Sequence, residues 1–73
     1  MYHTKENLIK GVGKNIRRIR EGKKLSIEYL ASQASIDYSQ LIRIENGKIN
    51  TSIYNVYMIA QALEVTVCDL FAL

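Results

Sequence analysis

The stretch SIEYLASQASIDYSQLIRIENG, residues 26–47, decides the fold. Ser26 begins it with a side chain that commonly caps a helix N-terminus, and Glu28 follows in the first turn, where an acid is favourable. Small and aliphatic side chains then recur at helical spacing on the inward side, namely Leu30, Ala31 and Ala34. The pattern predicts a short helix over about residues 27–34.

A second short helix is predicted after a turn. Asp37 is its N-cap, and Gln40 three residues later completes the pattern of a capping box. Gly47 ends the helix, which spans about residues 38–46 and has as its inward side chains Leu41 and Ile44. Two short helices joined by a turn of about three residues, inside a small helical protein, form a helix-turn-helix arrangement.

The residues before this stretch predict one longer helix. Apolar residues recur there at three- and four-residue steps: Leu8, Val12, Ile16 and Ile19. They place the helix at about residues 8–21. Gly11 and Gly13 are expected to weaken its first turn, and Gly22 is expected to stop it. Residues 1–7, before the helix, are expected to be flexible.

The residues after the stretch predict two further helices. Ser52 caps a helix over about residues 53–63, whose apolar side carries Val56, Ile59, Ala60 and Leu63. Thr66, with Asp69 three residues later, begins a last short helix. The β-branched residues are spread at helical spacing instead of alternating as in a strand. The predicted fold class is therefore all-α, a single compact domain of five helices over residues 1–73.

Composition excludes most other classes of protein. With 48% hydrophobic and 23% charged residues, the chain is too apolar for intrinsic disorder, and its hydrophobic runs are too short to span a bilayer. The N-terminus has no apolar stretch followed by a cleavage site, so a cytoplasmic protein is expected. One cysteine and one histidine provide no disulfide, metal site or catalytic arrangement. We expect no enzyme activity, metal or cofactor, and a Cys68 that is partly buried beside Val67 and Leu70.

Charge is unevenly distributed along the chain. Between residues 10 and 24 seven basic residues occur with a single acid, Glu21. The basic residues are Lys10, Lys14, Arg17, Arg18, Arg20, Lys23 and Lys24. After Gly47 the balance reverses, with Lys48 against Glu64 and Asp69. A localised basic stretch is typical of proteins that bind phosphates, and a solvated helix face is the alternative interpretation.

Three segments of the chain together resemble the lambda-repressor-like family of helix-turn-helix domains, also called the Cro/repressor or xenobiotic-response-element type. They are GKNIRRIREGKKLSIEYLA, IDYSQLIRIENGK and IAQALEVTVCDLF, and the resemblance extends from Val12 to Phe71. It implies five α-helices, of which the second and third form the DNA-binding motif and the third lies in the major groove. It also implies a sequence-specific transcriptional regulator, and controllers of restriction-modification systems are one such subtype.

The third helix carries the expected base-contacting residues. Tyr38, Ser39 and Gln40 lie in its first turn and Arg43 one turn later, so these side chains can reach base edges together. Arg43 can make two hydrogen bonds with guanine, or be a solvated charge, and Gln40 favours adenine. Tyr38 is suited to a phosphate contact or a base contact. Ile42 is expected to point outward, where it is an ordinary exposed side chain or packs against a thymine methyl group.

Residues around the third helix are expected to contact phosphates, which orient the protein without reading the sequence. They are Lys24, Ser26, Ile27, Asn46, Lys48 and Asn50. At Ile27 the family usually carries a Gln that binds phosphate, so only the backbone amide remains there. Lys24, Tyr29 or the basic first helix is expected to compensate.

Two further expectations concern the frame of the motif. Arg20 and Glu45 match family positions that form an ion pair between the first helix and the end of the third, so both are expected to be structural. Ser35 stands where the family usually has a glycine in a left-handed turn. The same conformation at Ser35 is expected to cost about 1 kcal/mol.

The last two helices carry more apolar groups than one small core can bury, so we expect them to form the interface of a symmetric homodimer. The candidates are Tyr54, Tyr57, Met58, Val67, Phe71 and Leu73, with a core position for Phe71 as the open alternative. A two-fold pair doubles the number of base-reading side chains. It calls for a pseudo-palindromic operator with half-sites about 10 bp apart.

The sequence therefore predicts a cytoplasmic transcription regulator, a repressor or an activator, that binds double-stranded DNA as a homodimer. No membrane and no small-molecule ligand are expected as partners. The alternative is an antitoxin or a protein-interaction module on the same scaffold. Its binding surface would use exposed apolar residues, namely Ile42, Ile49, Tyr54 and Tyr57.

Overall fold

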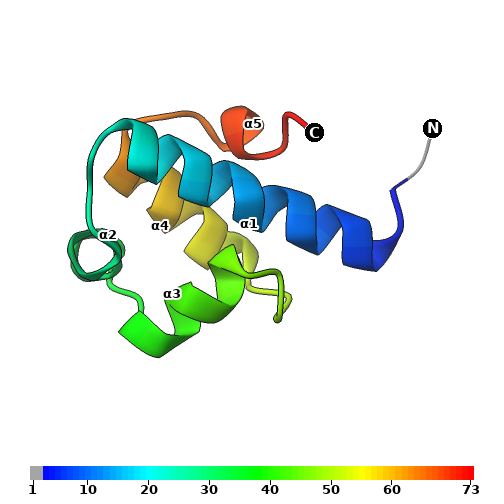
Figure 1. Cartoon of the computed structure of the whole chain (residues 1–73), viewed down its shortest axis with the longest axis horizontal. Helices are drawn as coiled ribbons and strands as arrows, with labels where there is room; N and C mark the ends of the chain where they lie inside the picture. Colours follow the sequence, from blue (N-terminus) through cyan, green and yellow to red (C-terminus); the bar gives the residue numbers. More distant parts are fainter. Residues whose placement is uncertain (1–2) are drawn as a thin grey trace.

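The computed structural model describes residues 3–73, and this part of the chain contains five α-helices and no strand. The helices are α1 (Lys5–Gly22), α2 (Ile27–Ala34), α3 (Tyr38–Glu45), α4 (Ile53–Leu63) and α5 (Val67–Leu70). Figure 1 shows α1 along the middle of the molecule, with α5 on one side of it, α2 and α3 on the other, and α4 behind. The predicted all-α fold is confirmed.

Short polar side chains make capping hydrogen bonds at the start of four of the five helices. The hydroxyl oxygens of Thr4, Ser26 and Ser52 each accept a hydrogen bond from the backbone N–H three residues further on. Thr66 and Asp69 form a reciprocal capping box at the start of α5. Each cap gives a partner to an N–H group that the first helical turn leaves unpaired. The starts predicted at Ser26, Ser52 and Thr66 are confirmed.

The first helix is longer than predicted. It begins at Lys5 and not near residue 8, because Thr4 supplies an N-cap that the spacing of apolar residues does not reveal. Residues 5–7, expected to be flexible, form its first turn. Residues 1–2, which were also expected to be flexible, lie outside the described residues.

The end of α1 also differs from the prediction. Gly22 does not stop the helix but is its last residue, and the left-handed residue is Lys24, with a φ of 59°. The turn is closed by the N–H of Lys24, which donates to the carbonyl of Glu21 at 2.9 Å, and by the N–H of Leu25, which donates to that of Arg20 at 3.1 Å. This turn leads directly into the cap of α2.

The start of α3 lacks the predicted capping box. Asp37 is the N-cap residue, but its side chain makes no capping hydrogen bond, so the expected pairing with Gln40 is wrong. The carboxylate of Asp37 instead accepts a hydrogen bond of 2.6 Å from the hydroxyl of Ser39. This bond lowers the pKa of Asp37, because it stabilises the charged form of the carboxyl group.

The core receives side chains from all five helices. The largest fully buried ones are Ile16, Leu30, Leu41, Ile59, Leu63 and Leu70. Asn15 fastens the C-terminal end to α1, because its Nδ2 donates to the carbonyls of Leu70, at 2.9 Å, and Ala72, at 3.1 Å. Leu41 and Ile44 hold α3 against the core, which leaves the opposite side of this helix accessible.

The turn between α2 and α3 contains a left-handed residue that is not glycine. Ser35 has a φ of 56° and a ψ of 42°, the conformation that the resemblance implies for this position. The next residue, Ile36, is buried, and its N–H donates to the carbonyl of Ala31 at 2.9 Å. Strain of about 1 kcal/mol at Ser35 is thus opposed by burial of an aliphatic side chain beside it.

Candidate nucleic-acid interface

The outward side of α3 carries the side chains expected to contact bases. Tyr38, Ser39 and Arg43 are exposed together on it, whereas Gln40 and Ile42 are partly buried. Each residue rotates the helix by about 100°, so Ile42 follows the buried Leu41 at the border of the inward side. The expectation that Ile42 points fully outward is therefore corrected.

The hydrogen bond between Ser39 and Asp37 determines what Ser39 can offer to a ligand. The hydroxyl proton of Ser39 is directed to the Asp37 carboxylate. The Ser39 oxygen keeps its capacity to accept. In this arrangement Ser39 is suited to accept a hydrogen bond from a donor on a base edge, such as the amino group of cytosine or adenine.

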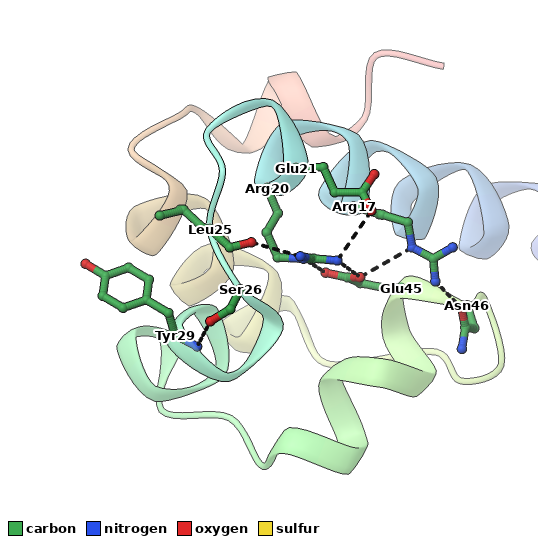
Figure 2. A network of polar contacts seen from close by, with 8 residues as sticks. All are labelled: Arg17, Arg20, Glu21, Leu25, Ser26, Tyr29, Glu45 and Asn46. Atoms are coloured by element: carbon green, nitrogen blue, oxygen red, sulfur yellow. Dashed lines mark hydrogen bonds and ion pairs between the residues drawn. The ribbon is translucent and has the colours of Figure 1, made fainter.

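The start of α2 presents backbone donors. The Oγ of Ser26 accepts a hydrogen bond of 3.0 Å from the N–H of Tyr29, so this side chain is engaged as the helix cap (Figure 2). The side chain of Ile27 is partly buried against the core, which leaves its backbone N–H as the group that can face a ligand. Lys24 and Tyr29 are exposed close by in the chain. A helix N-terminus with an adjacent lysine is a favourable environment for an anion.

A tight turn follows α3 and contains further expected phosphate contacts. Asn46, Lys48 and Asn50 are exposed. Gly47 between them is left-handed, with a φ of 69°, and a Cβ at this position would lie 2.9 Å from the Cα of Lys10. The turn after α3 is therefore held directly against α1.

Arg20 and Glu45 connect α1 to the end of α3. The Nε of Arg20 lies 2.7 Å from one oxygen of the Glu45 carboxylate, and its Nη2 lies 3.0 Å from the other. The remaining Nη1 donates to the carbonyl of Leu25 at 2.9 Å (Figure 2). The side chain of Glu45 is 1% exposed and that of Arg20 12%. The bond to Glu45 raises the pKa of Arg20, so the guanidinium stays charged.

Arg17 extends this network and was missed from the sequence. Its Nε lies 3.5 Å from the Glu45 carboxylate, and its Nη2 donates to the side-chain oxygen of Asn46 (Figure 2). The available signal was spacing, because Arg17 precedes Arg20 by three residues and so shares its side of α1. Two arginines of α1 therefore contact adjacent residues at the end of α3.

Gly13 permits this close approach. A Cβ on Gly13 would lie 2.4 Å from the carbonyl oxygen of Ile44 and 2.7 Å from that of Glu45. The backbone of α1 thus lies against the end of α3 at a distance that only glycine allows. The sequence interpretation treated Gly13 as a weak point of the helix, and it missed this packing role.

The comparisons with known proteins agree with this geometry. A family described as a helix-turn-helix domain matches residues 13–73. Control protein C.MunI from a Mycoplasma species is 36% identical over 61 residues, which are 82% of either chain. This chain belongs to that helix-turn-helix family. It is a DNA-binding transcriptional regulator and, as predicted, not an enzyme.

Two solved structures of controller proteins are similar to this helix-turn-helix regulator. The restriction-modification controller protein C.AhdI from Aeromonas hydrophila is 33% identical, with a TM-score of 0.84, and the match covers 86% of this chain and 96% of that one. The wild-type controller C.Esp1396I is 30% identical, with a TM-score of 0.80, over 88% of this chain and 82% of that one. The predicted resemblance to the lambda-repressor-like fold is confirmed.

A second surface of the regulator is apolar. A groove of about 350 Å³ lies between α1, α4, α5 and the loop before α4. Its apolar lining comes from Leu8, Ile9, Val12, Ile44, Ile49, Ile53, Val56, Tyr57, Val67 and Phe71. Large apolar side chains stand exposed at or beside it: Ile53, Tyr54, Tyr57, Val67 and Phe71. We define these five exposed residues and the groove as the apolar face.

The structure revises several expectations about this face. Ile53, at 89% the most exposed of the large apolar side chains, was not among the candidates. Met58 and Ile49, expected at the surface, are partly buried against the core. Leu73 lies over Gly11, where a Cβ would be 2.6 Å from its Cδ2. Cys68 is exposed, because α5 buries Leu70 and turns Cys68 outward, so the expected partial burial of Cys68 is wrong.

Two absences apply to the described part of the regulator. Residues 3–73 contain no group of three or more side chains that could bind a metal ion. None of the helices within this range combines the length and the hydrophobicity that a transmembrane span requires.

Proposed function

We propose that this regulator binds a specific operator in duplex DNA with α3 in the major groove. The observation that carries the proposal is the two-sided construction of α3. Its inward side is fixed by buried Leu41 and Ile44 and by the Arg20–Glu45 ion pair, while its outward side exposes polar groups. A rigidly held helix with exposed polar side chains is suited to read base edges.

The outward residues of α3 are proposed as base readers. Arg43 pairs with a guanine through two hydrogen bonds, and Tyr38, Ser39 and Gln40 contact neighbouring positions. Ile42, at the border of this side, is close enough in the helix to contact a thymine methyl group. Each good bidentate contact is worth about 1 to 3 kcal/mol of discrimination against the wrong base.

Phosphate contacts are proposed on both sides of α3. Before it lie Lys24 and the start of α2, with Ser26 and the backbone N–H of Ile27. After it lie Asn46, Lys48 and Asn50. These groups are exposed or carry free first-turn amides, and they flank the base-reading side. They would orient the protein on any sequence.

We also propose that the working species is a homodimer formed through the apolar face. Support comes from its five exposed large side chains, since apolar patches of this kind on small proteins mark interaction sites. A two-fold interface puts the same face on both copies, so a side chain of one copy can enter the groove of the other. Tyr54, Tyr57, Val67 and Phe71 are proposed contacts, Leu73 lies at the edge, and Ile53 is added to them.

The role that we propose is control of transcription, as a repressor or an activator in the cytoplasm, by occupancy of an operator, as in a controller protein. The similarity of this chain to the controller proteins C.MunI, C.AhdI and C.Esp1396I supports the controller role. The test is selection of bound sequences from random duplex DNA at stated salt. We expect a pseudo-palindrome with half-sites about 10 bp apart and a log-log salt slope of about −0.9 per phosphate contacted. Recovery of no preferred sequence, together with binding that does not depend on salt, would refute the proposal.

A further inference from the structure

Arg17 makes a contact that the neutralisation of Glu45 does not require. Glu45 already receives two hydrogen bonds from Arg20, at 2.7 and 3.0 Å, whereas the Nε of Arg17 lies 3.5 Å from the same carboxylate. The Nη2 of Arg17 donates to the side-chain oxygen of Asn46. The main contact that Arg17 adds is therefore the one with Asn46.

This bond fixes the orientation of the Asn46 amide. Arginine only donates hydrogen bonds, so the atom of Asn46 that faces it must be the acceptor Oδ1. The Nδ2 group, with its two N–H donors, then points away from Arg17, as Figure 2 shows. Within residues 3–73 no side chain or backbone group accepts a hydrogen bond from this Nδ2. Its donors are available to a ligand.

The position of Asn46 explains why this orientation matters. Asn46 follows Arg43 by three residues, so it continues the outward side of α3 at the carboxyl end of the helix. That end carries a partial negative charge, which disfavours an anion. The guanidinium of Arg17 opposes this charge and keeps N–H donors outward. Without Arg17 the amide is free to rotate and present its oxygen, which repels phosphate.

We propose that Arg17 is a positioning residue for a DNA phosphate: it holds the Asn46 amide so that Nδ2 donates to a phosphate beside the carboxyl end of α3. The inference rests on the proposed function, in which α3 lies in the major groove. It deepens that function by assigning the orientation of one phosphate contact to a residue of α1.

A double-mutant cycle tests the proposal on the duplex obtained from the selection above. We expect Arg17→Ala and Asn46→Ala each to weaken binding by about tenfold, since Asn46→Ala removes the charge-assisted hydrogen bond to phosphate and Arg17→Ala leaves its donor unoriented. The double variant should be no more than about twofold weaker than either single variant, because both changes remove the same contact. Losses that multiply to about a hundredfold would overturn the proposal.

Arg18→Ala is the matched control. It removes the same charge from α1, but the Arg18 side chain bonds Asn15 and not Asn46. In the double variant of Arg18→Ala and Asn46→Ala, the fold losses in DNA affinity of the two single variants should multiply. In the free protein, the two Nδ2 protons of Asn46 should shift in the NMR spectrum of Arg17→Ala and stay in place in that of Arg18→Ala. Unchanged Asn46 signals in Arg17→Ala would contradict the positioning role.

A further variant keeps the test independent of Arg17 substitutions. Asn46→Asp retains an acceptor for Arg17 and removes the N–H donors, so it should melt like the parent and bind DNA at least as weakly as Asn46→Ala. Parent-like affinity of Asn46→Asp would refute the inference. Failure of the parent itself to bind any duplex would refute the proposed function instead, so the two failures are distinguishable.

Discussion

The joint between α1 and α3 and the apolar face are built in opposite ways. At the joint, charged and polar groups are buried and paired, with Glu45 held by two arginines of α1. Among residues 3–73 no buried side-chain polar atom lacks a partner. On the apolar face, large side chains such as Ile53 and Tyr54 remain exposed.

The difference separates what the chain completes alone from what it leaves for another molecule. Exposed apolar side chains contribute a favourable free energy only when a second surface buries them. The polar groups of the joint are already buried and paired within one chain. Substitutions at the joint should therefore change the free energy of unfolding. Substitutions of the five exposed residues of the apolar face should change association and leave folding nearly unaffected.

The largest effect is expected from breaking the ion pair at the joint. Arg20→Ala leaves the buried Glu45 carboxylate without its main partner, which should cost about 3 to 5 kcal/mol of unfolding free energy. Urea denaturation measures it. Loss of DNA binding should follow only as a consequence of unfolding. Equal stability of Arg20→Ala and the parent would show that the pair is not structural.

A smaller effect is expected at the glycine of the same joint. Gly13→Ala places a Cβ within 2.4 Å of the Ile44 carbonyl oxygen, so α1 and α3 must separate, at a cost of about 1 to 3 kcal/mol. Gly22→Ala is the control, because a Cβ there meets nothing within 4 Å. It should be neutral or stabilising by up to about 1 kcal/mol. Thermal melting measures both variants. Equal melting temperatures for Gly13→Ala and Gly22→Ala would contradict the close packing.

The sequence predicts local features of the structure better than contacts between helices. The caps at Ser26 and Ser52 were predictable because a cap acts within three residues of itself. The left-handed turn at Ser35 followed from the family resemblance. Gly13 as a contact and Arg17 as a partner of Asn46 depend on the packing of α1 against α3, which local spacing does not report.

The candidate site was predictable to a similar extent. The outward position of Tyr38 and Arg43 follows from helical periodicity and was readable. The exposure of Ile53 was not, because hydrophobicity alone assigns an isoleucine to a core or to an interface equally well. The predicted partial burial of Cys68 was wrong because α5 has only four residues. A helix of one turn has too few residues for periodicity to indicate which side faces the core.

On the apolar face, a charge should affect association more than folding. Tyr57→Glu should change the free energy of unfolding by about 0.5 kcal/mol or less, because the side chain is exposed, and should give folded monomers. Sedimentation at micromolar concentration compares it with a dimeric parent. Exposed Tyr29→Glu, outside the face, is the control and should leave the dimer intact. A Tyr57→Glu variant that remains dimeric would remove the apolar face as the interface.

The smallest expected effect is a pH dependence at the start of α3. The Ser39 hydroxyl lowers the pKa of Asp37 below its ordinary value of 3.8, so the folded state favours the charged carboxylate. This contribution is present above about pH 4 and is lost as the pH falls through the lowered pKa. Ser39→Ala should therefore lower the melting temperature slightly at pH 7 and by less at pH 2. An equal difference at both pH values would exclude the carboxylate as its cause.

The most direct measurement of DNA reading by α3 compares Arg43→Ala with Lys48→Ala on the selected operator and on its single-base-pair variants. Arg43→Ala should lose about 1 to 3 kcal/mol on the preferred site and its selectivity at one base pair. Lys48→Ala should weaken binding to every sequence alike and reduce the salt slope by about 1. If Arg43→Ala kept the base preferences of the parent at every position, α3 would not read the operator through Arg43.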